Sequence, residues 1–364
     1  MKLLFVSYSP IPMDVTMPER EPLGGSESCA AYLARQLAKN GHAVTFAARL
    51  SPATPEFVKG VRHVPLEALH DAAFFTSSEF DATIALSALP ATAYLKQAAP
   101  KALNIAWLHL LPDQTAMAPL AEMTPHIDCA VFVSNTQKEM VPFSGRSHVI
   151  GNGIAPAFQD MFTSAEELRA AKENRAAYTS MPYRGLHLLA EVIPRMRGGT
   201  QFDIFSAMQT YRAPDDQFAH LYQRLKNSPR TTYHGSVSQP VLAQQLRSAA
   251  FLSYPCAFVE TYCIAALEAI AAGLKVVSLE LGALPETTLG FADLLPLNMD
   301  MTDPEIVTDY IALLEKNVMD FQVEPREWAE ERFEQSRSVN RLCSWPARAA
   351  EWEAFLASSI AASN

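Results

Sequence analysis

Two acidic side chains interrupt an otherwise apolar stretch of the sequence, FVETYCIAALEAIAAG, at residues 258–273. The apolar residues after the first acid recur at helical spacing and predict a buried helix that ends at Gly273. Glu268 falls in the middle of this helix and is the only charged side chain from 261 to 273. Because an unpaired carboxylate is expensive to bury, we expect it to have a partner. A vicinal diol such as a ribose can donate two hydrogen bonds to it; a structural salt bridge or partial exposure is the alternative.

The start of the same helix suits a negatively charged ligand. Backbone N–H groups near Tyr262, Cys263 and Ile264, together with the helix dipole, are candidates for binding a phosphate. Glu260 comes just before this end, where a carboxylate stabilises a helix by about 0.3–1 kcal/mol even without a ligand. The segment therefore combines a candidate phosphate site with two carboxylates, Glu260 and Glu268.

A glycine pair precedes another predicted helix, in the stretch PLGGSES. Gly24 and Gly25 allow the backbone to approach a ligand closely, and Ser26 is a good N-cap residue. A glycine pair in this position is a weak signal for a phosphate-binding loop, because a simple helix-entry turn has the same composition.

Four further residues lie where predicted strands end, at the edge where α/β sheets bind ligands. His109 ends the stretch WLH and could hydrogen-bond a sugar hydroxyl or act as an acid or base; the alternative is a packed or surface histidine. Arg184 comes between a strand and a helix, where its planar fork could bind a phosphate or cap a surface loop. Gly282 and Glu286 lie in the loop after the strand KVVSLE.

The elements that must position these residues form two similar series. Short apolar runs alternate with amphipathic helical stretches, which predicts parallel sheets covered by helices on both faces. The more polar stretch 151–175 shows no strand signal, and we interpret it as an interdomain connection. The sequence thus predicts an α/β chain of two Rossmann-like domains, at 1–155 and 156–343, facing a cleft, with a final helix at about 344–364 that returns to the first domain.

Composition narrows the functional class. The formal net charge of −10 over 364 residues argues against non-specific nucleic-acid binding. Five cysteines without CxxC spacing argue against a disulfide framework or a zinc site, and favour a cytoplasmic protein. The short apolar run at the N-terminus reads as a first strand, and no segment is apolar for long enough to span a bilayer, although peripheral association with the inner face of a membrane stays open. No DxD, HExxH or other metal-ligand spacing is present.

The order of these signals resembles the retaining GT-B glycosyltransferases of glycosyltransferase family 4 over nearly the whole chain. LGGSE resembles the family's N-terminal glycine loop, and VSNTQKEM followed by VIGNGI resembles its interdomain crossing. YRGLHLLAEVIPRM resembles the first turn and helix of its second domain. The most specific block is 233–287, whose two glutamates separated by seven residues match the family signature.

The resemblance implies a role for each part of this block. Glu268 would bind the ribose of a donor nucleotide, and Glu260 would contact the transferred sugar near its reacting face. The backbone at 262–264 would meet the diphosphate and the sugar. The implied co-substrate is a UDP- or GDP-sugar, with no cofactor and no metal.

The resemblance also assigns residues outside the block, with two departures. Arg184 matches the family's basic diphosphate ligand, usually Lys; His109 matches a histidine that contacts the donor sugar, and Gly25 would approach the diphosphate. Thr179 stands where the family commonly has a second cation, so one contact to the diphosphate is missing or comes from elsewhere. Cys263 replaces a usual glycine, which could crowd the sugar pocket and change donor preference.

The expected activity is therefore retaining transfer of a sugar to an acceptor hydroxyl, in which Glu260, His109 and Arg184 carry the chemistry. The acceptor could be a saccharide, a lipid-linked glycan, a protein or a small molecule, in glycan or glycoconjugate biosynthesis. A sugar-nucleotide epimerase of the same fold would act on the donor alone, and a non-catalytic nucleotide-sugar binding protein would bind without turnover. Donor tests with and without an acceptor separate these alternatives.

Overall fold

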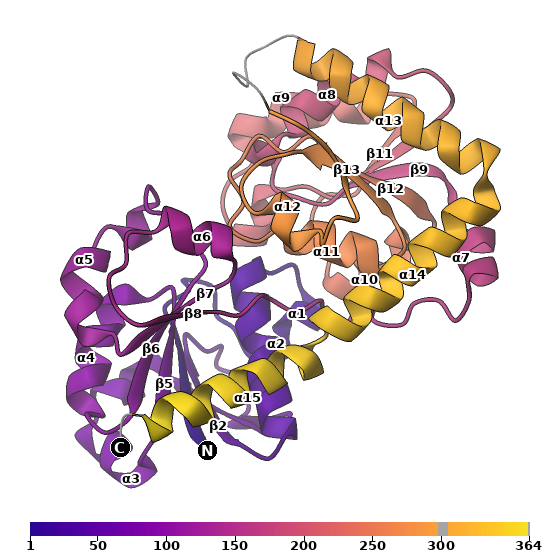
Figure 1. Cartoon of the computed structure of the whole chain (residues 1–364). Helices are drawn as coiled ribbons and strands as arrows, with labels where there is room; N and C mark the ends of the chain where they lie inside the picture. Colours follow the sequence, from indigo (N-terminus) through magenta and orange to yellow (C-terminus); the bar gives the residue numbers. More distant parts are fainter. Residues whose placement is uncertain (298–304, 363–364) are drawn as a thin grey trace. The chain divides into compact units, whose positions relative to one another are not determined.

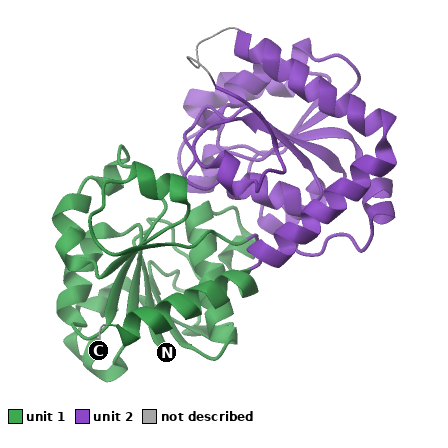
Figure 2. Ribbon diagram, in the orientation of Figure 1, with its two compact units in different colours: residues 1–153, 345–364 green, residues 154–344 purple. Residues whose placement is uncertain are grey.

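A computed structural model describes residues 1–297 and 305–362 of the chain (Figure 1). The chain divides into two compact units (Figure 2). Unit 1 comprises residues 1–153 and 345–364, and unit 2 comprises residues 154–344. Each unit is a parallel sheet flanked by helices, as the alternation of apolar runs and amphipathic stretches predicts.

Unit 1 is built on an 8-stranded sheet with the order β3-β4-β2-β1-β5-β6-β7-β8. Its strand pairs are parallel except for β3 and β4, which are antiparallel. The strands are β1 (Lys2–Ser7), β2 (Ala43–Ala48), β3 (Phe57–Val58), β4 (Val61–Pro65), β5 (Ala82–Leu86), β6 (Leu103–Leu108), β7 (Cys129–Phe132) and β8 (Ser147–Val149). The helices are α1 (Met17–Arg20), α2 (Gly25–Lys39), α3 (Ala72–Ser78), α4 (Leu89–Ala98), α5 (Leu120–Met123), α6 (Asn135–Met140) and α15 (Trp345–Ala361).

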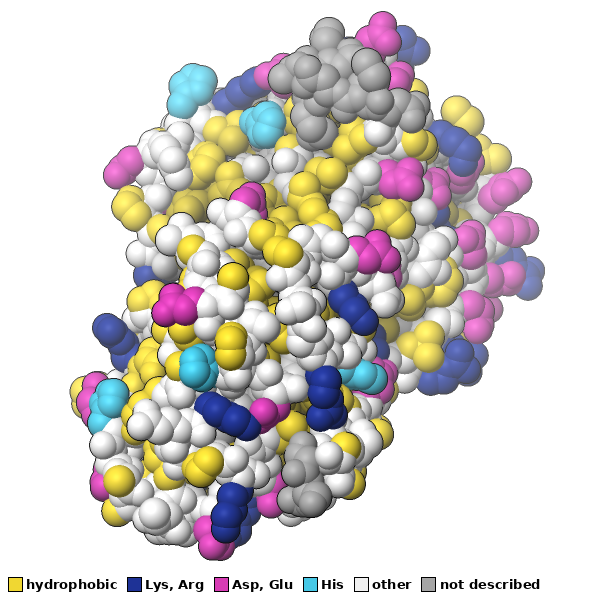
Figure 3. All heavy atoms as spheres, turned by 60° about the vertical axis from the view of Figure 1, so that its left-hand side comes forward, with side chains coloured by type: hydrophobic (Ala, Val, Ile, Leu, Met, Phe, Trp, Pro, Cys, Tyr) yellow, Lys and Arg dark blue, Asp and Glu magenta, His cyan; other side chains and the backbone are white. Residues whose placement is uncertain are grey.

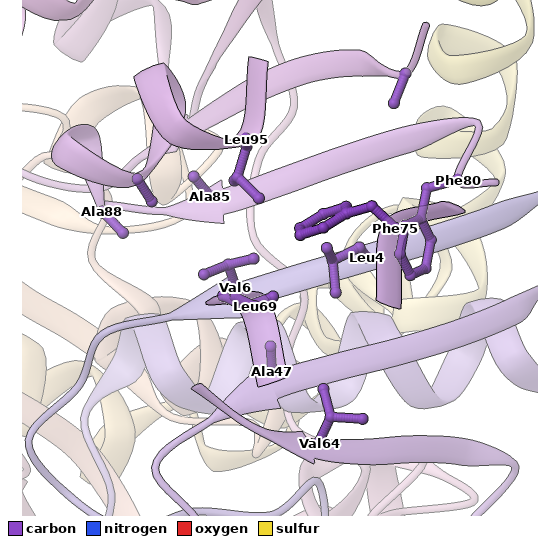
Figure 4. Close-up of a cluster of buried hydrophobic side chains, with 12 residues drawn as sticks. Leu4, Val6, Ala47, Val64, Leu69, Phe75, Phe80, Ala85, Ala88 and Leu95 are labelled. Atoms are coloured by element: carbon purple, nitrogen blue, oxygen red, sulfur yellow. The ribbon is translucent and has the colours of Figure 1, made fainter. Parts of the chain in front are cut away.

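Buried apolar side chains pack the sheet of unit 1 against α3 and α4 (Figure 4). Leu4 and Val6 alternate along β1 so that both reach this cluster, while Phe75 and Leu95 reach it from the helices. Each of these side chains is at most 6% exposed. The cluster makes β1 and β5 a rigid base for the loops that follow them.

The last helix, α15, completes unit 1. Trp352 is fully buried and packs edge-on against Trp107 of β6, with ring centroids 5.0 Å apart. Trp345 lies 6.2 Å from the ring of Tyr32 in α2, and a Cβ added to Gly153 would lie 2.8 Å from the Trp345 ring. The indole contacts therefore fasten the end of the chain to elements formed by its first 153 residues.

Unit 2 is built on a 6-stranded sheet with the order β11-β10-β9-β12-β13-β14, in which the strand pairs are parallel. The strands are β9 (Glu173–Tyr178), β10 (Gln201–Ile204), β11 (Thr231–Tyr233), β12 (Ala249–Tyr254), β13 (Lys275–Leu279) and β14 (Asp293–Leu295). The helices are α7 (Ala165–Ala171), α8 (Leu186–Arg195), α9 (Ala219–Lys226), α10 (Gln239–Leu246), α11 (Ile264–Ala271), α12 (Leu284–Thr287), α13 (Glu305–Val323) and α14 (Pro325–Cys343).

The stretch 151–175 contains the boundary between the two units, which falls after residue 153. It also contains α7, and β9 already begins at Glu173, so the expected absence of a strand is wrong at its end. The buried Lys172 Nζ, between these two elements in the chain, donates to the Ala272 carbonyl (2.7 Å), at the C-terminal end of α11, and to the Leu246 carbonyl (3.2 Å). One lysine thus satisfies carbonyls at the ends of α10 and α11.

Charges of both signs are interspersed on the face of the molecule drawn in Figure 3. Within residues 1–297 and 305–362, helices long and apolar enough to traverse a lipid bilayer are absent.

Candidate active site

Arg184 and Glu260 meet where the strand order of unit 2 reverses. The chain forms β9 first, adds β10 and β11 on one side, and then places β12 on the other side of β9. Arg184 ends a short 3-10 turn, Pro182–Arg184, just after β9, and Glu260 lies in the loop after β12. Loops at the carboxyl ends of the two strands flanking such a reversal diverge and leave room for a ligand.

Gly185 lets the two loops approach each other. Its φ is +119°, a conformation that residues with a side chain rarely adopt, and a Cβ added to it would lie 1.9 Å from the Pro255 carbonyl oxygen. The Arg184 carbonyl accepts a hydrogen bond from the Ala257 N–H at 3.2 Å. The backbone thus delivers Arg184 against the β12 loop before any side-chain interaction forms.

The two side chains form an ion pair. Arg184 Nη1 donates to Glu260 Oε1 at 2.9 Å and to Oε2 at 3.1 Å. The Glu260 side chain is 3% exposed, whereas the Arg184 side chain is 23% exposed. Tyr254, the last residue of β12, donates its hydroxyl to Glu260 Oε1 at 2.5 Å. The carboxylate is therefore deep and hydrogen-bonded, and the Arg184 side chain is partly exposed, although its Nε atom is buried.

The surroundings keep the guanidinium charged. Burial alone would lower the pKa of Arg184, but the adjacent Glu260 carboxylate raises this pKa well above its ordinary value. Burial, followed by the Glu260 charge, raises the pKa of Tyr254, so its hydroxyl stays a donor. The Arg184 Cζ atom also lies 4.6 Å from the Phe258 ring centroid and 5.8 Å from that of Tyr183, at cation–π distance.

Gly282 packs closely against the backbone of Glu260. Its φ is +60°, and an added Cβ would lie 2.4 Å from the Glu260 carbonyl oxygen and 2.6 Å from the Glu260 nitrogen. The neighbouring Ala283 N–H donates to the same carbonyl at 2.8 Å. The loop after β13, expected at the ligand edge of the sheet, therefore fixes the backbone of the first glutamate.

Glu268 lies inside α11 and is 6% exposed. Its Oε1 accepts a hydrogen bond from the Ala155 N–H at 3.0 Å, and Gln239 Nε2 lies 3.4 Å away. In the part of the chain that the structure describes, cations do not pair with it, so the salt-bridge and partial-exposure alternatives are wrong. Burial raises the pKa of this carboxyl to about 8, against the opposing effect of the Ala155 hydrogen bond.

At the start of α11, one of the three backbone N–H groups expected to be available for a phosphate already has a partner. The helix begins at Ile264 after Cys263, and it ends before Gly273, whose φ of +71° gives the predicted stop. The Ile264 N–H donates to the Tyr262 carbonyl at 3.1 Å, so this N–H already has an internal partner. Burial raises the pKa of the Cys263 thiol well above its ordinary value, which keeps the thiol protonated.

The glycine pair lies in unit 1, after β1. Gly24 has φ −59° and ψ 151°, which any residue adopts, and α2 begins at Gly25. Ser26 is already inside the first turn of α2, so its prediction as the N-cap is wrong. The sheet order of unit 1 reverses between β1 and β5, which places the glycine pair on a loop at that reversal.

His109 also lies in unit 1, directly after β6, and is 7% exposed. Its Nε2 lies 3.3 Å from Asn152 Oδ1, and its ring centroid is 4.7 Å from that of Trp107. Burial lowers the pKa of this imidazole to about 4, although the Asn152 hydrogen bond acts in the opposite direction. The ring is therefore neutral near pH 7, where it acts as a hydrogen-bonding group and has little capacity as an acid.

The sequence did not identify Tyr254 and Phe258, two residues of unit 2 that contact the Arg184–Glu260 ion pair. Their only signal is position: one ends the strand before the loop, and the other stands two residues before the first glutamate. Thr179 stands where the family commonly has a second cation. The next residue, Ser180, places its Oγ 3.3 Å from the Tyr254 hydroxyl and carries no charge. In residues 1–297 and 305–362, groups of three or more His, Cys, Asp or Glu side chains arranged for a metal ion are absent.

A known family model matches part of the chain. Residues 176–313 match the family model described as Glycosyl transferases group 1. This segment contains Arg184, Glu260 and Glu268. A search of curated proteins finds no match.

Solved structures similar to the chain include glycosyltransferases and synthases. Sucrose-phosphate synthase from Thermosynechococcus elongatus is 17% identical, with 99% of each chain covered and a TM-score of 0.75. HepE from Anabaena, in complex with UDP and glucose, is 15% identical over 98% of this chain and 100% of that one, with a TM-score of 0.71. WaaG, a glycosyltransferase involved in lipopolysaccharide biosynthesis, is 14% identical over 96% and 98%, with a TM-score of 0.64. The resemblance to the GT-B fold drawn from the sequence is confirmed.

Proposed function

We propose that the chain transfers a sugar from a nucleoside diphosphate sugar to an acceptor hydroxyl with retention of configuration. The proposal starts from its GT-B glycosyltransferase fold and from its match to the group 1 family model. The observation that carries the proposal is the Arg184–Glu260 pair at the strand reversal of unit 2, inside the matched segment. A buried carboxylate beside the partly exposed side chain of an arginine suits a sugar joined to a phosphate.

Each residue has a role in this proposal. Arg184, whose charge is secure, binds the diphosphate and stabilises the negative charge that develops as the sugar leaves. Glu260 accepts hydrogen bonds from hydroxyls of the transferred sugar, and Glu268 accepts them from the ribose. Gly24, Gly25 and the backbone at 262–264 approach the diphosphate. His109, being neutral, hydrogen-bonds the donor sugar.

The reaction proceeds on one face of the sugar. The bond between C1 and the phosphate oxygen breaks as the acceptor oxygen bonds to C1 from the same side. The acceptor proton passes to the departing phosphate oxygen. The products are the glycosylated acceptor and a nucleoside diphosphate. Charge stabilisation by Arg184 and backbone N–H groups serves this reaction without a metal ion.

The donor class is open to a direct experiment. HepE was solved with UDP and with UDP-glucose, which makes uridine nucleotides the first candidates. A thermal-shift panel of UDP, GDP and their sugars should raise the melting temperature for one base, because a ligand that binds the folded state stabilises it. Incubation with that donor and hydroxyl acceptors, in EDTA, then tests transfer, and NMR of the product tests retention.

The matched variants are Arg184→Ala and Glu260→Ala. Transfer at unchanged rates in both would remove the basis of the proposal. Conversion of the donor to its epimer without an acceptor would instead indicate an epimerase, and binding without turnover on any acceptor would indicate a binding protein.

A further inference from the structure

The ion pair between Arg184 and Glu260 uses a single nitrogen of the guanidinium. Arg184 Nη1 donates to both Glu260 oxygens, at 2.9 and 3.1 Å, so Nη2 takes no part in these two bonds. Within residues 1–297 and 305–362, the buried Nε of Arg184 has no hydrogen-bond partner. A pair formed through two nitrogens fixes the guanidinium plane, whereas a pair formed through one nitrogen lets the plane turn about that nitrogen.

The Phe258 ring contacts the same guanidinium. Its centroid lies 4.6 Å from Arg184 Cζ, a distance at which a guanidinium and the face of an aromatic ring attract each other. Tyr183, next to Arg184 in the chain, has its ring centroid 5.8 Å from Cζ and meets the Phe258 ring edge-on, with centroids 5.8 Å apart. The aromatic contact therefore constrains the plane of the guanidinium, which the Nη1 bonds do not.

Backbone contacts hold the Phe258 loop in place independently of the ring. The Ala257 N–H donates to the Arg184 carbonyl at 3.2 Å, and the buried Cys256 thiol donates to the Phe258 carbonyl at 3.1 Å. Both bonds use main-chain atoms at positions 184, 257 and 258. A substitution that removes the ring therefore changes the contact with the guanidinium and leaves these attachments of the loop intact.

We propose, resting on the function proposed above, that Phe258 is a positioning residue whose ring fixes the plane of the Arg184 guanidinium and thereby aims Nη2 at the diphosphate. A planar guanidinium has an orientation that stacking can fix, whereas a lysine ammonium is a point charge. Fixing the plane before the ligand arrives spares the site the entropy cost of ordering this side chain on binding. In this role Phe258 acts through Arg184 and does not itself touch the reacting atoms.

The test is a double-mutant cycle on Phe258→Leu and Arg184→Lys, in which calorimetry gives the dissociation constants of UDP, GDP, UDP-glucose and GDP-mannose. Phe258→Leu keeps an apolar side chain and removes the ring face. It should weaken the binding of the nucleotide that the wild-type protein prefers by about fivefold, the factor expected of a cation–π contact at a partly exposed site. In the Arg184→Lys background the same substitution should weaken binding by less than about twofold, because an ammonium has no plane to orient.

Two results of the cycle would overturn the proposal. Equal losses of affinity in both backgrounds would show that the Phe258 ring acts on the ligand or on the fold and not through Arg184. Undiminished affinity in Phe258→Leu would show that the ring does not position the guanidinium. If Phe258→Leu does not fold, Phe258→Met takes its place in the cycle with the same expected losses.

Matched variants separate the ring from the rest of the side chain. Phe258→Tyr keeps the ring face and should retain the wild-type affinity, so a loss as large as that of Phe258→Leu contradicts the proposal. Phe333→Leu removes a ring of α14 whose centroid lies 5.9 Å from Arg337 Cζ, and it should leave nucleotide affinity unchanged. Thermal unfolding shows that each variant is folded before its affinity is compared.

The outcomes also distinguish the two proposals. If the protein binds one of the nucleotides but the cycle shows no coupling, Phe258 does not position Arg184, and the glycosyltransferase proposal stands. If no nucleotide or nucleotide sugar of either base binds the wild-type protein, the proposed function is wrong and the inference is wrong with it.

Discussion

Arg184 and Glu260, 76 residues apart in the chain, are joined by two hydrogen bonds of 2.9 and 3.1 Å. The pair exists because the loops after β9 and β12 leave a reversal in strand order and because Gly185 allows them to touch. The same pair supplies the charge and the hydrogen-bond acceptor that the proposed reaction needs. Its removal should therefore affect both folding and transfer.

Arg184→Ala should lower kcat/KM for transfer by about 10²–10³, the usual loss when one group that stabilises developing charge is removed. Arg184→Lys keeps the charge and should lose less. The comparison is Arg224→Ala, which removes a cation from the exposed ion pair with Glu191. Rates are to be expressed per folded molecule, since the first variant leaves Glu260 without its cation. Equal activity of Arg184→Ala and Arg224→Ala would contradict the assignment.

The stability of the protein should depend on pH through Glu268. Its pKa is about 8 when folded and 4.5 ordinarily, so between these values the folded protein binds one more proton than the unfolded chain at this site. The contribution is fully present below about pH 4.5 and is lost as pH rises through 8. From pH 5.5 to 7.5 this lowers the free energy of unfolding by up to about 3 kcal/mol.

Glu268→Gln removes this ionisation and keeps an acceptor for the Ala155 N–H. Urea unfolding at pH 5.5 and 7.5 should show a smaller loss of stability in the variant than in the wild type. If both proteins lose the same free energy of unfolding between pH 5.5 and 7.5, Glu268 is ionised in the folded state near neutral pH.

Gly282→Ala should damage the site more than an alanine in an open left-handed turn. A Cβ at 282 would lie 2.4 Å from the Glu260 carbonyl oxygen, whereas Gly198, with φ +73°, has no atom within 4 Å of an added Cβ. Gly198→Ala should cost about 1 kcal/mol of conformational strain. Gly282→Ala should lower stability further and reduce transfer, as measured by urea unfolding and initial rates. Identical effects of the two variants would argue against a supporting role.

His109 should titrate well below an ordinary histidine. Its pKa of about 4 means that its imidazole stays neutral from pH 5.5 to 8, and the unfolded chain binds more protons than the folded one between about 4 and 6.5. This contribution to stability therefore falls as pH drops through that window. NMR titration of the His109 ring should give a midpoint below 5, with His109→Gln as the assignment control. A midpoint near 6.5 would contradict the buried environment.

Trp352→Ala should destabilise unit 1 by about 3–5 kcal/mol, the usual range for deleting a fully buried large aromatic side chain. It removes the edge-on contact with Trp107. Ser358→Ala, on an exposed position of the same helix, is the control. Thermal unfolding followed by tryptophan fluorescence measures both; equal melting temperatures would show that α15 contributes little to unit 1.

The spacing of apolar residues predicted much of unit 2 because the relevant physics is local. The end of α11 at Gly273 and the position of Glu268 beside a buried face both follow from helical periodicity and from glycine at a left-handed turn. The early start of β9 did not follow, since Lys172 is stabilised by carbonyls from distant helix ends. A polar stretch gives no local sign of such a partner.

The contacts that define the site were beyond sequence reasoning for the same reason. Glu268 receives its hydrogen bond from Ala155, 113 residues away, and Tyr254 reaches Glu260 through the shape of one loop. Residue types identified both glutamates and Arg184 as candidates. Their partners depend on strand order and on the backbone conformations of Gly185 and Gly282, which only the folded chain determines.

The position of α15 has a consequence for synthesis on the ribosome. Unit 1 starts with β1 at Lys2 yet is finished by residues 345–361, which are translated after every element of unit 2. The Trp107 and Trp352 indoles can pack together only after Trp352 has left the ribosome. Unit 2 is translated without interruption and can mature first, leaving the earlier-made sheet with an uncovered apolar face that is a natural client for chaperones.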